Sequence, residues 1–272
     1  MEPEAFPPPD LELLADLPFS THGLRLDLLR LREQAPGRRP AVMHLHGGAW
    51  RMFSKWPVAN VFLARAGFVT VSVDYRLAPG ALFPAQLHDV KTAVRWLRAH
   101  ADAYGIDPDR LGVWGVSAGG HLAGLLGTTA GQPDLEGAEG GWAGESSGVQ
   151  AVGNVCGVMD FLDPAMGFGP EPFALFGAPL AERPDLAVRA SPVTHASATS
   201  APFLHLHGRQ DAEVPVSQAR RMHAALSAAG ARSELVELEG DHSIHETHQA
   251  EVERRLLAFF RQELIRTPVE SR

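Results

Sequence analysis

Ser117 is the residue best placed for chemistry, because of the glycines around it. It sits at the centre of Gly115-Val116-Ser117-Ala118-Gly119, between an apolar run and the helical run Leu122–Leu126. A strand that turns sharply into a helix needs small residues two positions before and after the turn, where the two elements cross. The helix N-terminus adds partial positive charge where an oxyanion would form. We interpret Ser117 as a nucleophile; an inert serine in a glycine-rich turn is the alternative.

A second glycine-rich stretch, His46–Trp50, follows a predicted strand. Small residues after a strand let consecutive backbone N–H groups point at one place. Together with the N–H after the nucleophile, such groups form the oxyanion hole of esterase-type hydrolases. We expect Gly48, Ala49 and Ala118 to donate these hydrogen bonds, with Gly47 giving the loop its freedom. An ordinary strand-to-helix turn is the alternative.

A serine nucleophile needs an imidazole base that is oriented by a carboxylate, and in this kind of site the chain order is serine, acid, histidine. Asp211 lies in the loop after the next-to-last predicted strand, and His242 is the first histidine after the last strand. We predict that Asp211 is the acid and that His242 is the base. Glu213 and His245 are the rival candidates.

Three histidines spaced three residues apart, His242, His245 and His248, invite comparison with a zinc site. The zincin motif places two histidines four residues apart, and this stretch is one residue short of that spacing. We therefore interpret the last two as solvated helix residues and expect no metal. The lone cysteine, Cys156, has no glycine turn around it and is interpreted as a small buried apolar residue. We expect His46 to brace its loop through a hydrogen bond.

The elements that must hold these residues alternate between strand and helix. Apolar β-branched runs predict strands, and one-faced apolar stripes predict helices. Such alternation implies the α/β class, with a mostly parallel sheet and helices on both of its faces. The predicted strands are Ala41–Leu45, Val69–Val73, Leu111–Trp114, Ala151–Val155, Phe203–Leu206 and Leu235–Leu238. The predicted helices cover about 55–66, 85–103, 118–128, 216–229 and 244–264.

Residues 17–32 depart from this alternation. Pro18–Thr21 and Leu24–Leu31 flank a His22-Gly23 turn, which predicts a hairpin of two antiparallel edge strands. About 16 residues then remain before it for an N-terminal cap over the site. A cap this short predicts a fairly open pocket.

Two long connections are expected at opposite edges of the sheet. Residues 131–148 follow a helix, which predicts a flexible surface loop at the amino edge. Residues 157–195 follow a strand and so lie at the carboxyl edge, where open α/β sheets bind ligands. We expect 157–195 to act as a small lid that shapes the pocket, although its phenylalanines could equally form a local core. Candidates for the apolar wall are Phe161, Phe168, Phe173 and Phe176. Trp50 either lines the acyl pocket or packs under its loop.

Length and composition limit the other functions. The 272 residues allow one large domain or two small ones, and the spread of the nucleophile, acid and base over residues 117–242 favours a single domain over 1–272. The formal net charge is −8, and a lone cysteine cannot form a disulfide within the chain. No basic stripe indicates nucleic acid or an anionic membrane as a partner, and no apolar run is long enough to span a bilayer. The acidic start lacks the features of a signal peptide, which favours a cytoplasmic location. The oligomeric state is not encoded in any pattern.

These motifs together resemble the α/β-hydrolases of the hormone-sensitive-lipase-like branch, close to the bifunctional feruloyl/acetyl-xylan esterases and the arylformamidases. The resemblance covers residues 20–265 and implies a mostly parallel eight-stranded sheet. It also implies a serine carboxylesterase that hydrolyses short-chain acyl or aryl esters of small molecules without a cofactor. An arylformamidase is the alternative enzyme, and a non-catalytic small-molecule binder is the alternative of another class. The motifs are His46–Trp50, Asp74–Pro79, Phe83–Val90, Tyr104–Pro108, Gly115–His121, the Asp211 loop and Gly240-Asp241-His242.

The resemblance carries two further expectations. Residues 74–79 and Asp89 would be structural, tying the oxyanion loop to the following helix. The family's loop usually has a third glycine where this chain has Ala49. Because a Cβ is unfavourable at positive φ, Ala49 should have negative φ, or the donor geometry should differ.

Overall fold

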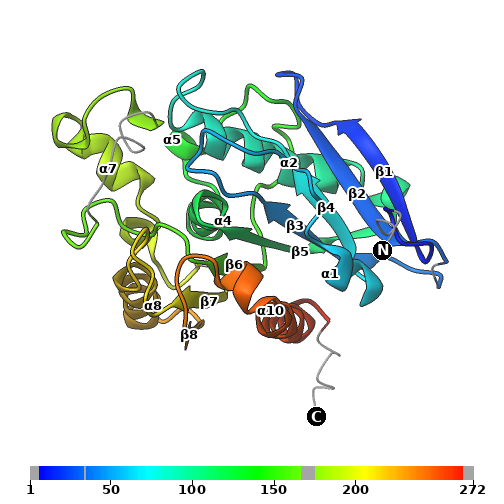
Figure 1. Cartoon of the computed structure of the whole chain (residues 1–272). Helices are drawn as coiled ribbons and strands as arrows, with labels where there is room; N and C mark the ends of the chain where they lie inside the picture. The colour runs from blue at the N-terminus through cyan, green and yellow to red at the C-terminus, as the bar shows by residue number, and fades with distance from the viewer. Residues whose placement is uncertain (1–5, 34, 167–174, 266–272) are drawn as a thin grey trace, which may run out of the picture.

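The computed structural model describes residues 6–33, 35–166 and 175–265, which form an α/β structure around one eight-stranded sheet (Figure 1). The strand order is β1-β2-β4-β3-β5-β6-β7-β8. Every neighbouring pair from β4 to β8 is parallel, as predicted, and β2 pairs antiparallel with both β1 and β4. The strands are β1 Leu11–Pro18, β2 Arg25–Leu31, β3 Arg39–Leu45, β4 Val69–Val73, β5 Ile106–Val116, β6 Ala151–Val155, β7 Phe203–Gly208 and β8 Ser233–Leu238.

The edge hairpin exists, but its first strand was predicted in the wrong place. That strand is Leu11–Pro18 rather than 18–21, and Leu11 pairs with Leu31 while Leu17 pairs with Leu26. This register places more leucines opposite each other than the predicted one, and it turns Phe19 into a fully buried core residue. Fewer residues than the expected 16 therefore precede the hairpin.

The helices agree with the prediction in position but not always in length. The range 55–66 contains only a short helix at its end, because Pro57 and the contacts of the Lys55 backbone N–H and side chain hold the preceding residues in an irregular loop. The predicted helices 85–103 and 244–264 are each interrupted, at His100 and His248. The helices are α1 Val61–Arg65, α2 Ala85–Ala99, α3 Ala101–Tyr104, α4 Ala118–Thr128, α5 Pro133–Glu136, η1 Leu180–Glu182, α7 Pro184–Ala190, η2 Pro192–His195, α8 Ser217–Ala228, α9 Ile244–Thr247 and α10 Gln249–Leu264.

Helices cover both faces of the sheet and enclose two apolar cores. Figure 1 shows α2 and α4 on one side and α1 and α10 on the other. Val113 of β5 belongs to the first core, and its neighbour Trp114 belongs to the second. Small residues let α10 approach closely, since a Cβ on Gly112 would lie 2.8 Å from the ring of Phe260. No helix in the described part of the chain has the length and apolar character needed to cross a bilayer.

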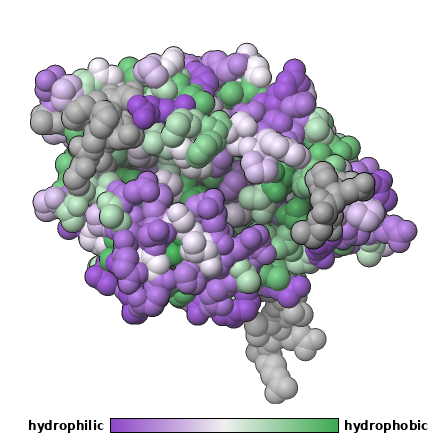
Figure 2. Space-filling model, viewed as in Figure 1, coloured by the Kyte–Doolittle hydropathy of each residue, from purple (hydrophilic) through white to green (hydrophobic). Residues whose placement is uncertain are grey.

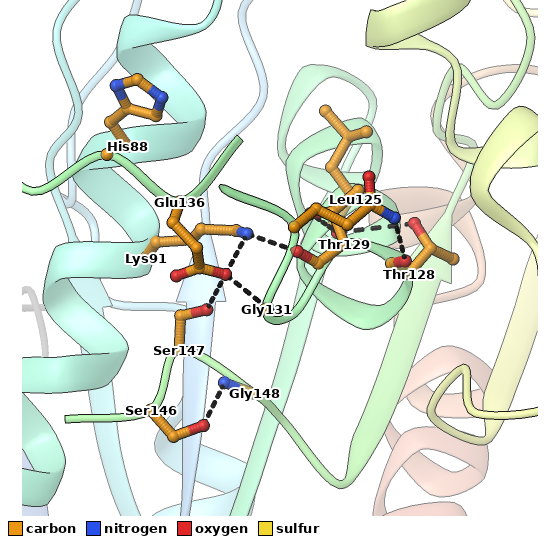
Figure 3. A network of polar contacts seen from close by, with 12 residues as sticks. His88, Lys91, Leu125, Thr128, Thr129, Gly131, Glu136, Ser146, Ser147 and Gly148 are labelled. Atoms are coloured by element: carbon orange, nitrogen blue, oxygen red, sulfur yellow. Dashed lines mark hydrogen bonds and ion pairs between the residues drawn. The ribbon is translucent and has the colours of Figure 1, made fainter. Parts of the chain in front are cut away.

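The 131–148 connection is anchored, which its glycine content did not indicate. Lys91 of α2 is fully buried, and its Nζ lies 2.7 Å from both Glu136 Oε1 and the Thr129 carbonyl oxygen (Figure 3). Arg95 and the Ser147 hydroxyl also bind the Glu136 carboxylate. Burial lowers the pKa of Lys91 although Glu136 opposes the shift. The expected surface loop is thus fixed to α2 by a partly buried ion cluster.

Candidate active site

Ser117 occupies the sharp turn between β5 and α4. Its backbone is strained, with φ +55° and ψ −117°, and its N–H donates to the Val155 carbonyl oxygen at 2.9 Å. A non-glycine residue at positive φ persists only where the surrounding structure holds it there. The strain is therefore maintained by the packing on both sides of the turn.

The glycines around Ser117 provide that packing. A Cβ on Gly115 would collide with the Gly119 carbonyl group, and one on Gly119 would collide with the backbone oxygen of Leu45. A Cβ on Gly120 would lie 2.6 Å from Asn154 Oδ1. Only glycine fits at these three positions, because the atoms met are backbone or a buried side chain. The glycine spacing is needed because strand and helix cross at these positions, as predicted.

Asp211 and His242 are brought together although 31 residues separate them in the chain. His242 Nδ1 lies 2.7 Å from Asp211 Oδ2. The other carboxylate oxygen accepts the backbone N–H groups of Glu213 at 3.0 Å and Val214 at 2.8 Å. These bonds fix the plane of the Asp211 carboxylate, and His242 Nε2 takes no part in them.

Neither rival occupies the same place. Glu213 has an exposed side chain and meets Asp211 only through its backbone. His245 lies in α9, and its ring is paired at 3.7 Å with Glu246. The geometry therefore favours the two residues chosen from the sequence.

Close packing of two loops explains how the pair forms. A Cβ on Gly208, at the end of β7, would collide with the backbone oxygen atoms of Gly240 and Asp241. The Gln210 N–H donates to the Gly240 carbonyl oxygen at 2.9 Å. The loop after β7 and the loop after β8 thus lie against each other at the carboxyl edge of the sheet.

Asp211 and His242 shift each other's pKa. Burial disfavours the Asp211 anion, but hydrogen bonds from His207, His242 and the Val214 N–H outweigh it and lower the pKa of Asp211. Burial likewise disfavours a charge on His242, but the Asp211 carboxylate raises the pKa of His242 above its usual value. Asp211 is therefore anionic at neutral pH, and a protonated His242 would be stabilised by it.

The glycine-rich loop lies beside Ser117, with an unusual backbone. A Cβ on Gly47 would stand 3.5 Å from the Ser117 Cβ. Positive φ angles occur at Gly48 (+94°), Ala49 (+49°) and Trp50 (+59°). Negative φ, one of the two outcomes expected for Ala49, does not occur, because the chain folds back here so that the Gly48 carbonyl oxygen accepts two N–H groups, from Arg51 and Met52. The other outcome, a different donor geometry, stays a prediction. A Cβ in this region costs about 1 kcal/mol per residue.

Side chains from distant elements hold this loop. The Tyr75 hydroxyl donates to the carbonyl oxygens of His46, at 2.9 Å, and Gly47, at 3.2 Å. The His46 ring stacks on Tyr75 with 4.2 Å between centroids and bonds to the Gly47 carbonyl oxygen through Nδ1. The bracing predicted for His46 is confirmed. Arg76 pairs with Asp89 of α2, which agrees with the structural role that the resemblance implied for 74–79 and Asp89.

Trp50 packs under the loop, one of the two arrangements considered for it. It is 4% exposed, and its indole N–H donates to His121 Nδ1 at 3.0 Å. His121 in turn bonds through Nε2 to the Ala190 carbonyl oxygen at 2.7 Å. Burial lowers the pKa of His121 to about 4, so the ring is neutral and Nδ1 can accept a hydrogen bond from the indole N–H. The His121 ring thus links the loop, α4 and α7.

The phenylalanines of 157–195 are buried where the structure describes them. Phe161 is 2% exposed and lies 5.8 Å from the Trp50 ring and 5.3 Å from the His121 ring, between centroids. Phe176 packs against Phe161 at 5.1 Å. Phe168 and Phe173 lie outside the described residues. Phe161 and Phe176 therefore form a local core that supports the oxyanion loop.

Several contributors to the site were not predicted from the sequence. His207 Nε2 lies 3.3 Å from Asp211 Oδ2 and 2.7 Å from the Val214 carbonyl oxygen. Its position next to a glycine, four residues before Asp211, was the only available signal. Cys156 is buried, as predicted, but its φ of +50° was not expected. These residues act through tertiary contacts that have no sequence period.

One group of possible metal ligands exists in the described part of the chain. The ligand atoms of Cys156, Asp211 and His242 lie within 4.8 Å of one another. Burial raises the pKa of the Cys156 thiol, so it is protonated, and the other two residues already bond to each other. These donors therefore do not fit a metal ion well, since ligation needs a thiolate.

The mostly parallel eight-stranded sheet and the strand–serine–helix turn define an α/β-hydrolase fold. The chain belongs to the BD-FAE family, whose sequence profile matches residues 26–226.

Relatives and solved structures agree with this membership. The chain is 35% identical over 227 residues to Esterase LipQ of Mycobacterium tuberculosis, covering 80% of this chain and 53% of that protein. It thus spans about half the length of that relative. A structure described as a truncated form of a carbohydrate esterase from gut microbiota matches with a TM-score of 0.85 and 26% identity, covering 94% of this chain and 97% of that one. Esterase 2 of Thermogutta terrifontis phosphoramylated by tabun matches with a TM-score of 0.76 and 27% identity, covering 95% and 97%.

Proposed function

We propose that this chain is a serine carboxylesterase that hydrolyses short-chain acyl or aryl esters of small molecules. The observation that carries the proposal is the 2.7 Å bond between His242 Nδ1 and Asp211, on the sheet edge where Ser117 is held at positive φ. The names of the relatives support an ester rather than another acyl compound, since they are an esterase and a carbohydrate esterase.

In this proposal the Ser117 hydroxyl attacks the ester carbonyl while His242 accepts its proton. His242 then gives the proton to the departing alcohol, which leaves an acyl group on Ser117. A water molecule attacks that acyl group and loses a proton to His242. His242 then returns the proton to the Ser117 oxygen as the bond to the acyl group breaks and the acid is released. Asp211 stabilises the imidazolium in both steps, as its effect on the pKa of His242 indicates.

The oxyanion is held by the backbone N–H groups of Gly48, Ala49 and Ala118, with Gly47 giving the loop its shape. Donors fixed before the reaction stabilise the developing charge without reorganisation, and each is worth about 10²- to 10³-fold in rate. The contacts of Tyr75 and Trp50 with this loop support a preformed hole. No cofactor takes part.

We further propose that 1–272 is one domain in which 157–195 shapes the pocket. Anchoring contacts support this role for the segment's first part. The Gln218 Oε1 accepts the N–H groups of Met159 and Asp160, each at 2.7 Å, and the Ser191 hydroxyl accepts that of Phe161. Phe168 remains a proposed pocket residue, whereas Trp50 and Phe161, which were also expected to line the pocket, support it from beneath the oxyanion loop.

Replacing the nucleophile tests the proposal. Ser117→Ala should abolish hydrolysis of p-nitrophenyl acetate while the circular dichroism spectrum and the unfolding midpoint stay unchanged. Turnover by a folded Ser117→Ala variant at the wild-type rate contradicts the assignment. Inactivity of the wild type on all esters, with activity on an N-formyl aryl amide, would favour an arylformamidase instead.

A further inference from the structure

Phe53 is the most exposed of the large apolar side chains in the described residues, at 68%. Its backbone has φ +71°, a conformation that bulky residues rarely adopt. Strained residues of this kind persist at ligand-binding and active sites, where the surrounding structure holds them. Exposure and strain in the same aromatic residue need an explanation, because both oppose folding.

The ring of Phe53 lies against the proposed oxyanion hole. A Cβ on Gly48 would stand 2.7 Å from Phe53 Cδ2, so the ring covers the bare Cα of that glycine. Gly48 is one of the proposed donors to the oxyanion. An ester whose carbonyl oxygen reaches this donor would therefore bring its remaining atoms within reach of the ring.

The loop that carries Phe53 is fixed in place. The Lys55 backbone N–H donates to Asp74 Oδ1 at 2.8 Å, and Lys55 Nζ lies 2.8 Å from Asp27 and 3.0 Å from Asp16. These contacts anchor the loop to β2, and they neutralise its lysine. The Phe53 ring is therefore exposed to solvent on a loop whose backbone is anchored.

Two further exposed apolar residues lie close to Phe53 in the chain. Met52 is 48% exposed and Trp56 is 51% exposed, and we name these two residues and Phe53 the oxyanion shelf. Apolar side chains gather in this way at ligand-binding surfaces. Figure 2 shows hydrophobic residues in green among hydrophilic residues in purple on one face of the molecule. The ring of Phe6 packs against the ring of Trp56 with 4.9 Å between centroids. The three side chains of the shelf are uncharged, so they suit an uncharged apolar group of a substrate.

We propose that the oxyanion shelf binds the aryl group of an ester substrate, with Phe53 as the residue that selects it. The proposal rests on the proposed esterase function and adds a specificity residue to it. A flat ring is the best match because an exposed aromatic face pairs with another ring more strongly than its buried area alone would give.

The test measures how Phe53→Ala changes discrimination between paired esters. The pairs are phenyl acetate with ethyl acetate, and ethyl benzoate with ethyl acetate, which place the ring on the alcohol and on the acyl side. We expect kcat/KM for at least one aryl ester to fall about ten-fold, mainly through KM, while ethyl acetate changes less than about two-fold. Phe53→Tyr, which keeps the ring, should retain the wild-type ratios.

Trp142 supplies a matched control elsewhere on the surface. It is also exposed, at 41%, and also has a positive φ, +60°, but it contacts Phe19 in the hairpin turn. Trp142→Ala should leave all ratios unchanged.

Two results overturn the shelf proposal while leaving the esterase function intact. In one, Phe53→Ala loses activity equally on aryl and ethyl esters, which would make Phe53 a prop for the oxyanion loop. In the other, no ratio changes. Inactivity of the wild type on every ester is a separate outcome that overturns the esterase function itself, and the shelf with it.

Discussion

The serine turn and the oxyanion loop are both strained, but they are held in different ways. At the turn only Ser117 has positive φ, and close backbone packing of glycines keeps it there. In the loop three non-glycine residues have positive φ, namely Ala49, Trp50 and Phe53. Their supports are side chains from other elements, such as Tyr75 and His121.

The difference shows two ways to preorganise a site. Backbone packing is local and tolerates no added atom. Side-chain bonds reach across the fold, and each can be removed alone at a smaller cost. A substitution in the serine turn should therefore abolish folding or activity altogether, whereas removing a single support of the oxyanion loop should lower activity only in part.

Adding one carbon at the turn should have the largest effect. In Gly119→Ala the new Cβ would meet the backbone oxygens of Leu45 and His46, which cannot move without displacing β3. We expect loss of the folded, active protein, measured by soluble yield and thermal unfolding. Gly144→Ala is the control, since its Cβ would meet nothing within 4 Å. Normal stability of Gly119→Ala would show that the close packing is not essential.

Removing the charge of Asp211 should impair catalysis by Ser117 without changing the conformation of the serine turn. Asp211→Asn keeps the side-chain volume but removes the charge that raises the pKa of His242. We expect kcat to fall by about 10⁴-fold. Steady-state hydrolysis of p-nitrophenyl acetate measures the loss, and an unchanged unfolding midpoint shows that the fold persists. A loss below ten-fold would argue against Asp211 as the triad acid.

Removing one bond from the loop should give a smaller loss. Trp50→Phe keeps an aromatic ring but deletes the N–H that bonds to His121 at 3.0 Å. Loss of this bond should let the N–H donors of the oxyanion hole shift, and we expect kcat to fall by about 10- to 100-fold. This loss is smaller than the loss of kcat that follows removal of a whole donor. KM should stay near its wild-type value. A change in KM alone would indicate that Trp50 contacts substrate instead.

The acid–base pair should also set the pH dependence. His242 must be neutral to accept the serine proton, and Asp211 raises its pKa above the usual 6.5. Activity should therefore be full above that raised pKa and fall about ten-fold per pH unit below it. The pH profile of kcat/KM measures the midpoint. A midpoint below 6.5 would contradict the inferred effect of Asp211.

Relieving strain in the loop should have the smallest effect. Ala49→Gly removes the Cβ from a residue with φ +49°. We expect the free energy of unfolding to change by less than about 1 kcal/mol, because the relief of strain is offset by the greater freedom of glycine in the unfolded chain. The same variant should keep kcat within about two-fold. Chemical denaturation and initial rates measure both.

The sequence predicted what depends on local patterns. The α/β class, the parallel strands and the glycine spacing around Ser117 follow from short-range periodicity and sterics, and the structure agrees. The first hairpin strand was misplaced because the His22-Gly23 turn was expected to follow it directly, whereas residues 19–24 connect the two strands. The positive φ of Ala49 belongs to a turn that closes on the Gly48 carbonyl oxygen and is held by Tyr75, and the glycine-rich pattern alone did not indicate it. Contacts of this kind, including His207 with Asp211, depend on the assembled fold.

Covalent labelling tests the central claim most directly. A fluorophosphonate should add to one residue of the wild-type protein, and peptide mapping by mass spectrometry should place the adduct on Ser117. Labelling should be absent in Ser117→Ala and much slower in Asp211→Asn, because the nucleophile depends on the acid–base pair. An adduct on another residue, or equal labelling of Ser117→Ala, would contradict the assignment of Ser117 as the nucleophile.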